Sequence, residues 1–212
     1  MAPLRSLVAA ALLLVSSVNA HFLLLHPTSL EGTEIDESKE GNAPCGANMP
    51  DLASSPSSEF HVGGDQVAVQ LSHPQANWLI RGTLDGKASG NWTQMFPIVK
   101  QSGVGAFCEI AVVAPEAWVG KKGVISVAAN APDGILYQCA VVNFVSGTNT
   151  TLDSNCRNAS SVTASPENDV QLAALISKAD TTTKGNSASG FGLPLGSLFA
   201  AAAMAMAGAA IL

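Results

Sequence analysis

The chain has 212 residues, a formal net charge of −6 and 47% hydrophobic residues. Nucleic-acid binding calls for a clustered basic surface, and sixteen acidic against ten basic side chains do not supply one. Apolar residues concentrate at the two ends of the chain, so the middle has the composition and the size of one ordinary domain.

Residues 1–20 show the three parts of a secretory signal peptide. Arg5 gives a basic start, an apolar run follows from Leu7 to Val15, and Val18–Ala20 fits the rule of small residues at the cleavage site. The apolar run is too short to span a bilayer, which takes about 20 residues. Cleavage after Ala20 would make His21 the first residue of the secreted protein; the alternative is that a histidine stands there by chance.

Residues 190–212 are typical of a GPI-attachment signal, which is removed in the mature protein. The apolar tail begins at Leu193 and no charged residue follows it, whereas a stop-transfer helix is normally followed by Lys or Arg. The small residues Gly185–Ser189 supply an attachment site, with Asn186 as the candidate. We therefore expect tethering to the outer leaflet of the plasma membrane or a place in the cell wall. A transmembrane helix is the alternative.

Residues 21–158 are expected to form the folded domain, and residues 159–189 a disordered, O-glycosylated Ser/Thr-rich stalk. Short apolar segments separated by Gly, Pro, Asn and Asp predict strands, and helical periodicity is essentially absent. The predicted strands are 22–25, 66–71, 76–84, 96–99, 107–113, 124–129 and 135–145. This pattern predicts an all-β protein, an antiparallel β-sandwich of immunoglobulin-like or fibronectin-like type.

The domain contains four cysteines: Cys45, Cys108, Cys139 and Cys156. An even number in an exported protein predicts two disulfides, whereas a thiolate zinc site would need close C-x-x-C pairs. The sequence alone allows three pairings, of which we favour Cys108 with Cys139 and Cys45 with Cys156. Three sequons predict N-glycosylation at Asn91, Asn149 and Asn158.

The α-amine and Nδ1 of a first-position His21 can close a chelate ring on one metal ion, and a second histidine would complete a T-shaped set of three nitrogens. Such a planar set suits Cu(II) best among the divalent first-row metals. His26 is a poor second ligand, because strand alternation directs it to the opposite face. His73 is a better candidate than His61, since Pro74 stiffens its turn; the alternative is a solvated turn histidine.

Five segments resemble the fungal copper acquisition factor family, GPI-anchored proteins similar to lytic polysaccharide monooxygenases. These segments are His21–Leu24, Ala43–Gly46, Gly63–Val67, Ser72–Pro74 and Gly134–Ala140. No single segment is specific, but their order is. Together with the stalk and the GPI tail, the resemblance spans essentially the whole chain.

The resemblance implies an immunoglobulin-like sandwich that binds one copper ion through the amine and imidazole of His21 and through His73. It also implies an aspartate near the metal. Members often continue the motif around Cys139 with an acid, whereas this chain has Val141. Asp133 is the nearby acid that could serve. The alternatives are a site with two histidines only, and Asp133 as a simple Asp-Gly turn residue.

Three functions compete for this chain. The resemblance favours a monomeric cell-surface protein that captures copper for copper acquisition or cell-wall homeostasis. It would pass copper to a plasma-membrane copper transporter, without oxidative cleavage of polysaccharide. The second candidate is a copper-dependent lytic polysaccharide monooxygenase, and the third is a structural, glycosylated wall domain. A GPI tether suits uptake more than attack on distant polysaccharide.

Aromatic residues bear on the choice between binding protein and enzyme. Oxidases of crystalline polysaccharide commonly present a flat aromatic platform. The large aromatic residues of this domain other than phenylalanine are Trp78, Trp92, Trp118 and Tyr137. Trp78 and Tyr137 fall within predicted strands, so we expect most of these four residues in the core.

Overall fold

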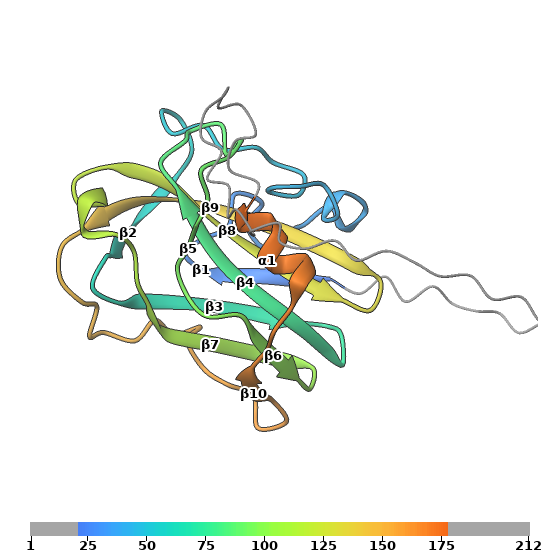
Figure 1. The fold of residues 1–212 in the computed structure, drawn as a ribbon. Helices are drawn as coiled ribbons and strands as arrows, with labels where there is room; N and C mark the ends of the chain where they lie inside the picture. Colours follow the sequence, from blue (N-terminus) through green and yellow to red (C-terminus); the bar gives the residue numbers. More distant parts are fainter. Residues whose placement is uncertain (1–20, 178–212) are drawn as a thin grey trace, which may run out of the picture. The chain divides into compact units, whose positions relative to one another are not determined.

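The computed structural model describes residues 21–177 (Figure 1). The predicted signal peptide, the attachment residue Asn186 and the apolar tail 190–212 lie outside the described residues. Within the described part, no helix is long and apolar enough to cross a membrane.

Within residues 21–177, ten strands form two sheets. The smaller sheet contains, in spatial order, β1 (Phe22–His26), β3 (Asp65–Leu71) and β7 (Gly105–Val112). The larger sheet contains, in order, β10 (Thr163–Pro166), β6 (Val99–Ser102), β4 (Gln75–Thr83), β8 (Lys122–Ala131), β9 (Gly134–Val145) and β2 (Ser57–His61), while β5 (Thr93–Gln94) pairs with β4. Short 3₁₀ turns, η1 (Glu37–Lys39) and η2 (Glu116–Trp118), interrupt two loops, and one helix, α1 (Val170–Ser177), ends the described chain.

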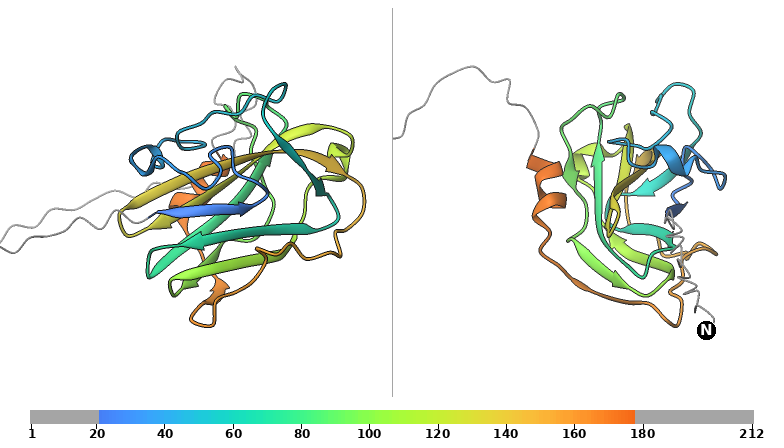
Figure 2. Two further views of the ribbon diagram at one scale, coloured as in Figure 1. Left: turned by 180° about the vertical axis from the view of Figure 1, so that it is seen from behind. Right: turned by 90° about the vertical axis from the view of Figure 1, so that its right-hand side faces the viewer.

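The two sheets face each other across one hydrophobic core (Figures 1 and 2). Along β3, Val67, Val69 and Leu71 occupy alternate positions and are at most 3% exposed, as expected for the inner face of a strand. They share the core with Trp78 of β4, on which Phe22 of β1 packs edge to face with ring centroids 5.1 Å apart. The predicted all-β sandwich is therefore confirmed, with one difference. Strand β2 pairs with β9 in parallel, so the larger sheet is mixed.

Helix α1 covers the outer face of the larger sheet (Figure 1). Leu172 is fully buried in a second apolar cluster with Leu79 of β4 and Tyr137 of β9. Asp169 caps the helix by accepting the N–H groups of Gln171 and Leu172 at 2.9 and 3.0 Å. Its other oxygen accepts the side-chain amides of Asn77 and Asn130, on β4 and β8.

The structure thus differs from the predicted stalk, which began at residue 159. Strand β10 and helix α1 both lie after that point, and the helix is anchored to the sheet. This Ser- and Thr-rich segment also contains three apolar residues that pack against strands distant in sequence: Leu172, Leu175 and Ile176. The folded domain therefore continues to the end of the described residues.

The favoured disulfide pairing is wrong. The bonds join Cys45 to Cys139 and Cys108 to Cys156, with Cα atoms 4.9 and 5.1 Å apart. Cys108 pairs in register with Ala68 on the outer face of the smaller sheet, whereas Cys139 faces outward from the larger sheet into the cluster around Cys45. Because packed sheets lie about 10 Å apart, cysteines on their two outer faces cannot meet.

On the edge of β1 that does not pair with β3, side chains form the hydrogen bonds that a neighbouring strand would form. Leu24 N–H donates to Oε1 of Gln138 at 3.0 Å, and Nε2 of Gln138 donates back to the carbonyl of Phe22. Phe22 N–H donates to Oε1 of Glu40 at 3.3 Å, and Gln138 also donates to Glu40. Glu40 and Gln138 are both fully buried, so they replace a neighbouring strand and hold β1 against β9.

We expect Glu40 to make folding stability depend on pH. Burial raises the pKa of its carboxyl from 4.5 to about 7, against the hydrogen bonds from Gln138 and Phe22, which lower it. Between pH 4.5 and 7 the folded state therefore holds a proton that the unfolded state has lost, and stability falls as pH rises through this window. The shift corresponds to about 3 kcal/mol at most.

The variant Glu40→Gln keeps an acceptor for both hydrogen bonds but cannot ionise. It should gain stability over the wild type as pH rises from 4.5 to 7, with no further gain above that range. Urea unfolding of both proteins between pH 4.5 and 8 measures this difference. A difference that stays constant across the range would contradict the assignment.

Candidate metal centre

Three segments that bear predicted site residues meet at one end of the sandwich, on the right of Figure 1. They are the start of β1, the β3–β4 turn at residues 72–74 and the β8–β9 turn at residues 132–134. Antiparallel pairing of β1 with β3 and of β8 with both β4 and β9 places these chain reversals at the same end. The right-hand view of Figure 2 looks toward this end.

Ser72 holds the main chain of His21. Its hydroxyl accepts from the nitrogen of His21 at 2.8 Å and donates to the carbonyl of His21 at 2.6 Å, and its own N–H donates to that carbonyl at 3.1 Å. The nitrogen of His21 is a peptide nitrogen while Ala20 is attached, and it stands in the place that an α-amine would take after cleavage. Because His73 follows Ser72, the pairing brings the two predicted ligands close together, one just before β1 and the other just after β3.

Each of these two imidazoles faces a carboxylate. Nδ1 of His21 lies 3.0 Å from Oε1 of Glu37, and Nε2 of His73 lies 2.9 Å from Oδ1 of Asp133. The His73 side chain is 7% exposed, whereas the side chains of His21, Glu37 and Asp133 are between 31% and 43% exposed. The site therefore combines one buried imidazole with groups that solvent can reach.

Neither ring nitrogen makes a hydrogen bond with these carboxylates. Nδ1 of His21 and Nε2 of His73 are buried atoms without a hydrogen-bond partner in the described part of the chain, because the nearby oxygens lie outside hydrogen-bond geometry. A neutral ring nitrogen without its proton and a carboxylate oxygen are both acceptors. Two acceptors this close are stable only with a proton on the ring or a cation between them. The donor set therefore fits a cation.

The structure does not join all the predicted ligands into one cluster. Among residues 21–177, no group of three or more His, Cys, Asp or Glu side chains is arranged to hold a metal ion. His73 and Asp133 are in contact, while in the same range no hydrogen bond or ion pair links His21 to either of them. The site as described is two His–carboxylate pairs side by side.

His26 is remote from this end, but not for the reason that alternation suggests. A bulge between Leu24 and His26 shifts the register, so that His26 pairs with Ala68 while Leu23 pairs with Gln70. His26 thus returns to the face of His21 and Leu23. Its partner Ala68 lies four residues before Ser72, about 13 Å along the strand, and Nδ1 of His26 is 3.7 Å from Oδ2 of Asp153.

His61 lies near the opposite end of the larger sheet. It pairs with Val145, eleven residues and about 36 Å along β9 from Gly134. Its Nδ1 is 2.9 Å from Oδ2 of Asp65, and the same oxygen accepts the N–H of His61. His61 is therefore a histidine with a local structural partner.

The sequence reasoning missed Glu37 and Ser72. Glu37 is one of several acids in the long loop before β2, and nothing in its spacing distinguishes it from Glu34 or Asp36. Ser72 precedes a predicted ligand, but its role depends on the β1–β3 register, which composition and periodicity do not determine.

The predicted glycosylation sites differ in accessibility. Asn91 and Asn158 are exposed, and the side-chain oxygen of Asn158 accepts the N–H of Cys108 at 2.8 Å. Asn149 is half-buried, and its amide nitrogen donates to Asp65 at 2.9 Å. The glycosylation of all three stays a prediction.

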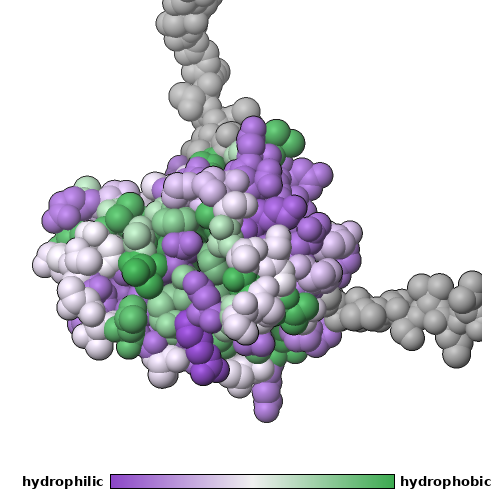
Figure 3. Space-filling view, turned by 90° about the horizontal axis from the view of Figure 1, so that it is seen from below, coloured by the Kyte–Doolittle hydropathy of each residue, from purple (hydrophilic) through white to green (hydrophobic). Residues whose placement is uncertain are grey.

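The aromatic residues lie in the core, as expected. Trp78, Trp92, Trp118 and Tyr137 are all at most 9% exposed. The large apolar side chains exposed in the described part are aliphatic: Met49, Val104, Ile110, Val113, Val119, Leu152 and Val170. Figure 3 shows apolar residues interspersed with polar ones on one face.

These features define a two-sheet β protein, crosslinked by two disulfides, with histidine–carboxylate pairs at one end. Over residues 19–161 the chain matches the family described as copper acquisition factor BIM1-like, and it belongs to that family. The matched range contains His21, His73, Asp133 and all four cysteines. No curated protein matches the chain. Membership of this family gives the protein a copper-related role.

Proposed function

We propose that the mature protein binds one copper ion at the His21 end and handles it at the cell surface, for copper acquisition or cell-wall homeostasis, without oxidative cleavage of polysaccharide. One observation carries this proposal. In a member of a copper acquisition family, two buried ring nitrogens at the predicted site lack hydrogen-bond partners and face carboxylates.

The ligand set that we propose combines main-chain and side-chain nitrogen. Cleavage after Ala20 would free the α-amine of His21 beside its own Nδ1, and Nε2 of His73 would supply the third nitrogen. The Ser72 hydroxyl, 2.8 Å from the nitrogen of His21, would orient the amine. A planar three-nitrogen set favours Cu(II).

A carboxylate would complete the site. Asp133 already contacts His73, and its side chain is 41% exposed, so it could bind the metal and still give a receiving protein access. Glu37 is the competing acid, because it lies 3.0 Å from Nδ1 of His21. A site with two histidines only remains the third arrangement.

Copper handling fits these surroundings better than oxidation does. A carboxylate ligand would stabilise Cu(II) and occupy a position that a reacting oxygen species needs. The buried Trp and Tyr residues cannot form an aromatic platform for crystalline polysaccharide. The second candidate, a copper-dependent monooxygenase, is favoured by the pairing of an N-terminal histidine with His73. A structural, glycosylated wall domain would leave the orphan nitrogens without a role.

The first prediction from this proposal concerns the chelate. The mature protein should bind one Cu(II) with an axial electron paramagnetic resonance signal that shows nitrogen couplings. One extra residue ahead of His21 should weaken binding by orders of magnitude, because it converts the amine into a peptide nitrogen. His73→Ala should also weaken binding, and His26→Ala is the matched control that should not. Unchanged affinity in the extended protein would sink the proposal.

The second prediction separates the two carboxylates. Asp133→Asn should lower Cu(II) affinity about 10- to 100-fold, the range typical of lost ligands and their close partners, while Glu37→Gln should have a smaller effect. Glu34→Gln, which changes an exposed acid of the same loop, is the control. Competition titration with a copper chelator measures all three. The reverse order of effects would assign the carboxylate position to Glu37.

The third prediction is that copper-loaded protein releases no oxidised oligosaccharides from cellulose, chitin, xylan or β-glucan in the presence of ascorbate and peroxide. Mass spectrometry of the soluble products tests this. Oxidised sugars that disappear in the His73→Ala variant would make the monooxygenase the better assignment.

The fourth prediction concerns anchoring. Phosphatidylinositol-specific phospholipase should release the protein from membranes, and mass spectrometry should place the end of the mature chain between about Gly185 and Ser189. Detection of peptides from Phe199–Leu212 in the mature protein would contradict a GPI anchor.

A further inference from the structure

Arg81 is a buried cation on the outer face of the larger sheet, away from the His21 end. It lies six residues after Gln75, where β4 begins next to the His73 turn, about 20 Å along the strand, and is 3% exposed. Burial lowers the pKa of its guanidinium to about 10, so the group remains charged at neutral pH.

The guanidinium is held firmly in one orientation. Its Nη1 donates to the carbonyl of Leu175 in helix α1 at 2.8 Å, and its Nε donates to Oγ of Ser126 at 3.4 Å. Its central carbon lies 4.2 Å from the centroid of the Trp92 ring and 5.9 Å from that of Tyr137, within cation–π range. A planar fork of donors fixed in this way is prepared for a planar or tetrahedral anion.

Among residues 21–177, no carboxylate lies within ion-pair distance of Arg81, and its Nη2 has no hydrogen-bond partner in that range. The acid of the adjoining loop, Asp85, is engaged locally, because it accepts the N–H groups of Lys87 and Ser89. Buried charges in proteins are normally paired. The absence of a carboxylate partner for Arg81 among these residues therefore indicates a site for an anionic ligand.

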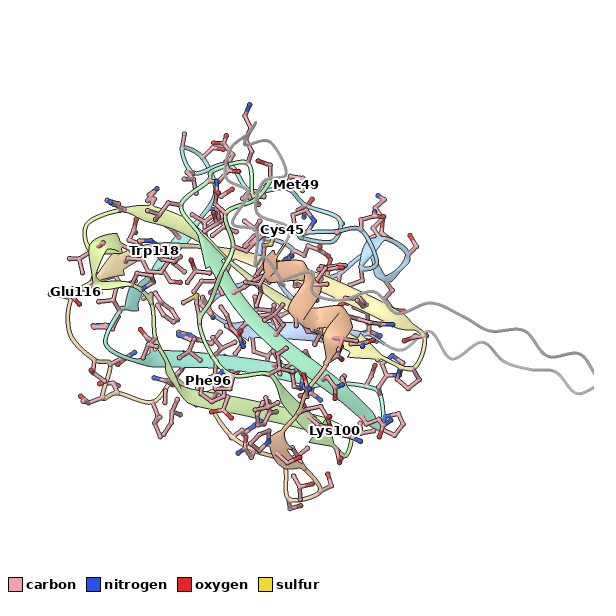
Figure 4. All side chains as sticks on the ribbon, viewed as in Figure 1. Cys45, Met49, Phe96, Lys100, Glu116 and Trp118 are labelled. Atoms are coloured by element: carbon pink, nitrogen blue, oxygen red, sulfur yellow. A yellow bond between two sulfur atoms is a disulfide. The ribbon has the colours of Figure 1, made fainter. Side chains whose placement is uncertain are left out.

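A pocket of about 420 Å³ opens beside this cation. Its polar lining includes Arg81, Lys87 and Ser89, and its apolar wall includes Pro44, Met49 and Trp92. Figure 4 shows Met49, from the long loop, near the top of the view and Lys100 near the bottom. Two cations at an apolar concave surface make a site for an anion with a small organic body.

We infer that this pocket binds a small oxyanion, a carboxylate or a phosphate, whose oxygens accept from the guanidinium of Arg81 and from Lys87. A sugar acid such as glucuronate and inorganic phosphate share this chemistry, and only the former carries an organic ring that could pack against the apolar wall. The site is separate from the His21 end and does not depend on the proposed copper function.

Isothermal titration of the full mature chain with glucuronate and, separately, with inorganic phosphate tests the inference. Saturable binding at one site per chain is expected for at least one of the two. Arg81→Gln should weaken that binding by at least about tenfold, because it removes the buried partner of the anion. Lys87→Ala should weaken it several-fold, while Lys100→Ala, which removes an equal charge elsewhere, should leave it unchanged. Copper binding should stay the same in all three variants.

If Arg81→Gln fails to fold, a variant of the exposed Lys87 takes its place in the test. Lys87→Glu should then abolish binding, because it puts a negative charge beside the anion. Three results would overturn the inference: no heat with either anion, an equal loss in Lys87→Ala and Lys100→Ala, or binding that appears only in Asp180→Asn. Asp180 follows Leu175 by five residues in the sequence. The last result would mean that the chain's own carboxylate occupies the pocket.

Discussion

The side-chain amide of Gln138 is the contact on which the His21 end depends. Strand β1 is at the edge of its sheet, and it has only five residues. With unpaired backbone groups along its outer edge, it would be held only by its hydrogen bonds to β3 and by core packing. Gln138 and Glu40 supply the donors and acceptors of a missing neighbour and tie β1 to the larger sheet. Because His21 immediately precedes β1, this link between the sheets also determines where the main-chain nitrogen of His21 lies.

The sandwich supports two distinct chemical environments, one at its His21 end and one on the outer face of its larger sheet. One end presents imidazoles and carboxylates from turns between strands, where loops can vary without disturbing the core. The outer face carries a buried guanidinium between β4, helix α1 and the long loop that ends in β2. The disulfide from Cys45 to Cys139 holds that loop on β9, so it stabilises the walls of the pocket and leaves the core packing to the strands.

Most of the strands could be predicted from the sequence, since apolar and polar residues nearly alternate along residues 66–71 and residues 135–145 are mostly apolar and bounded by turn residues. The segment 96–99 was misplaced, because β6 begins at Val99 and ends at Ser102. Strand β2 is absent from the predicted strands, because Ser57–His61 has only one fully buried residue, Phe60, and its apolar pattern does not stand out. Helix α1 is two turns long and too short for periodicity to stand out.

The sequence by itself determined the all-β class, the even set of cysteines and the histidines worth considering, because these depend on residue type and local spacing. Only the tertiary structure decided which cysteines pair, that a bulge returns His26 to the face of His21, and that Glu37 comes within 3.0 Å of an imidazole. It also revealed that Arg81 is buried and that, among the described residues, no carboxylate lies within ion-pair distance of it. Each of these features depends on register and on contacts between residues far apart in the chain, which local pattern does not encode.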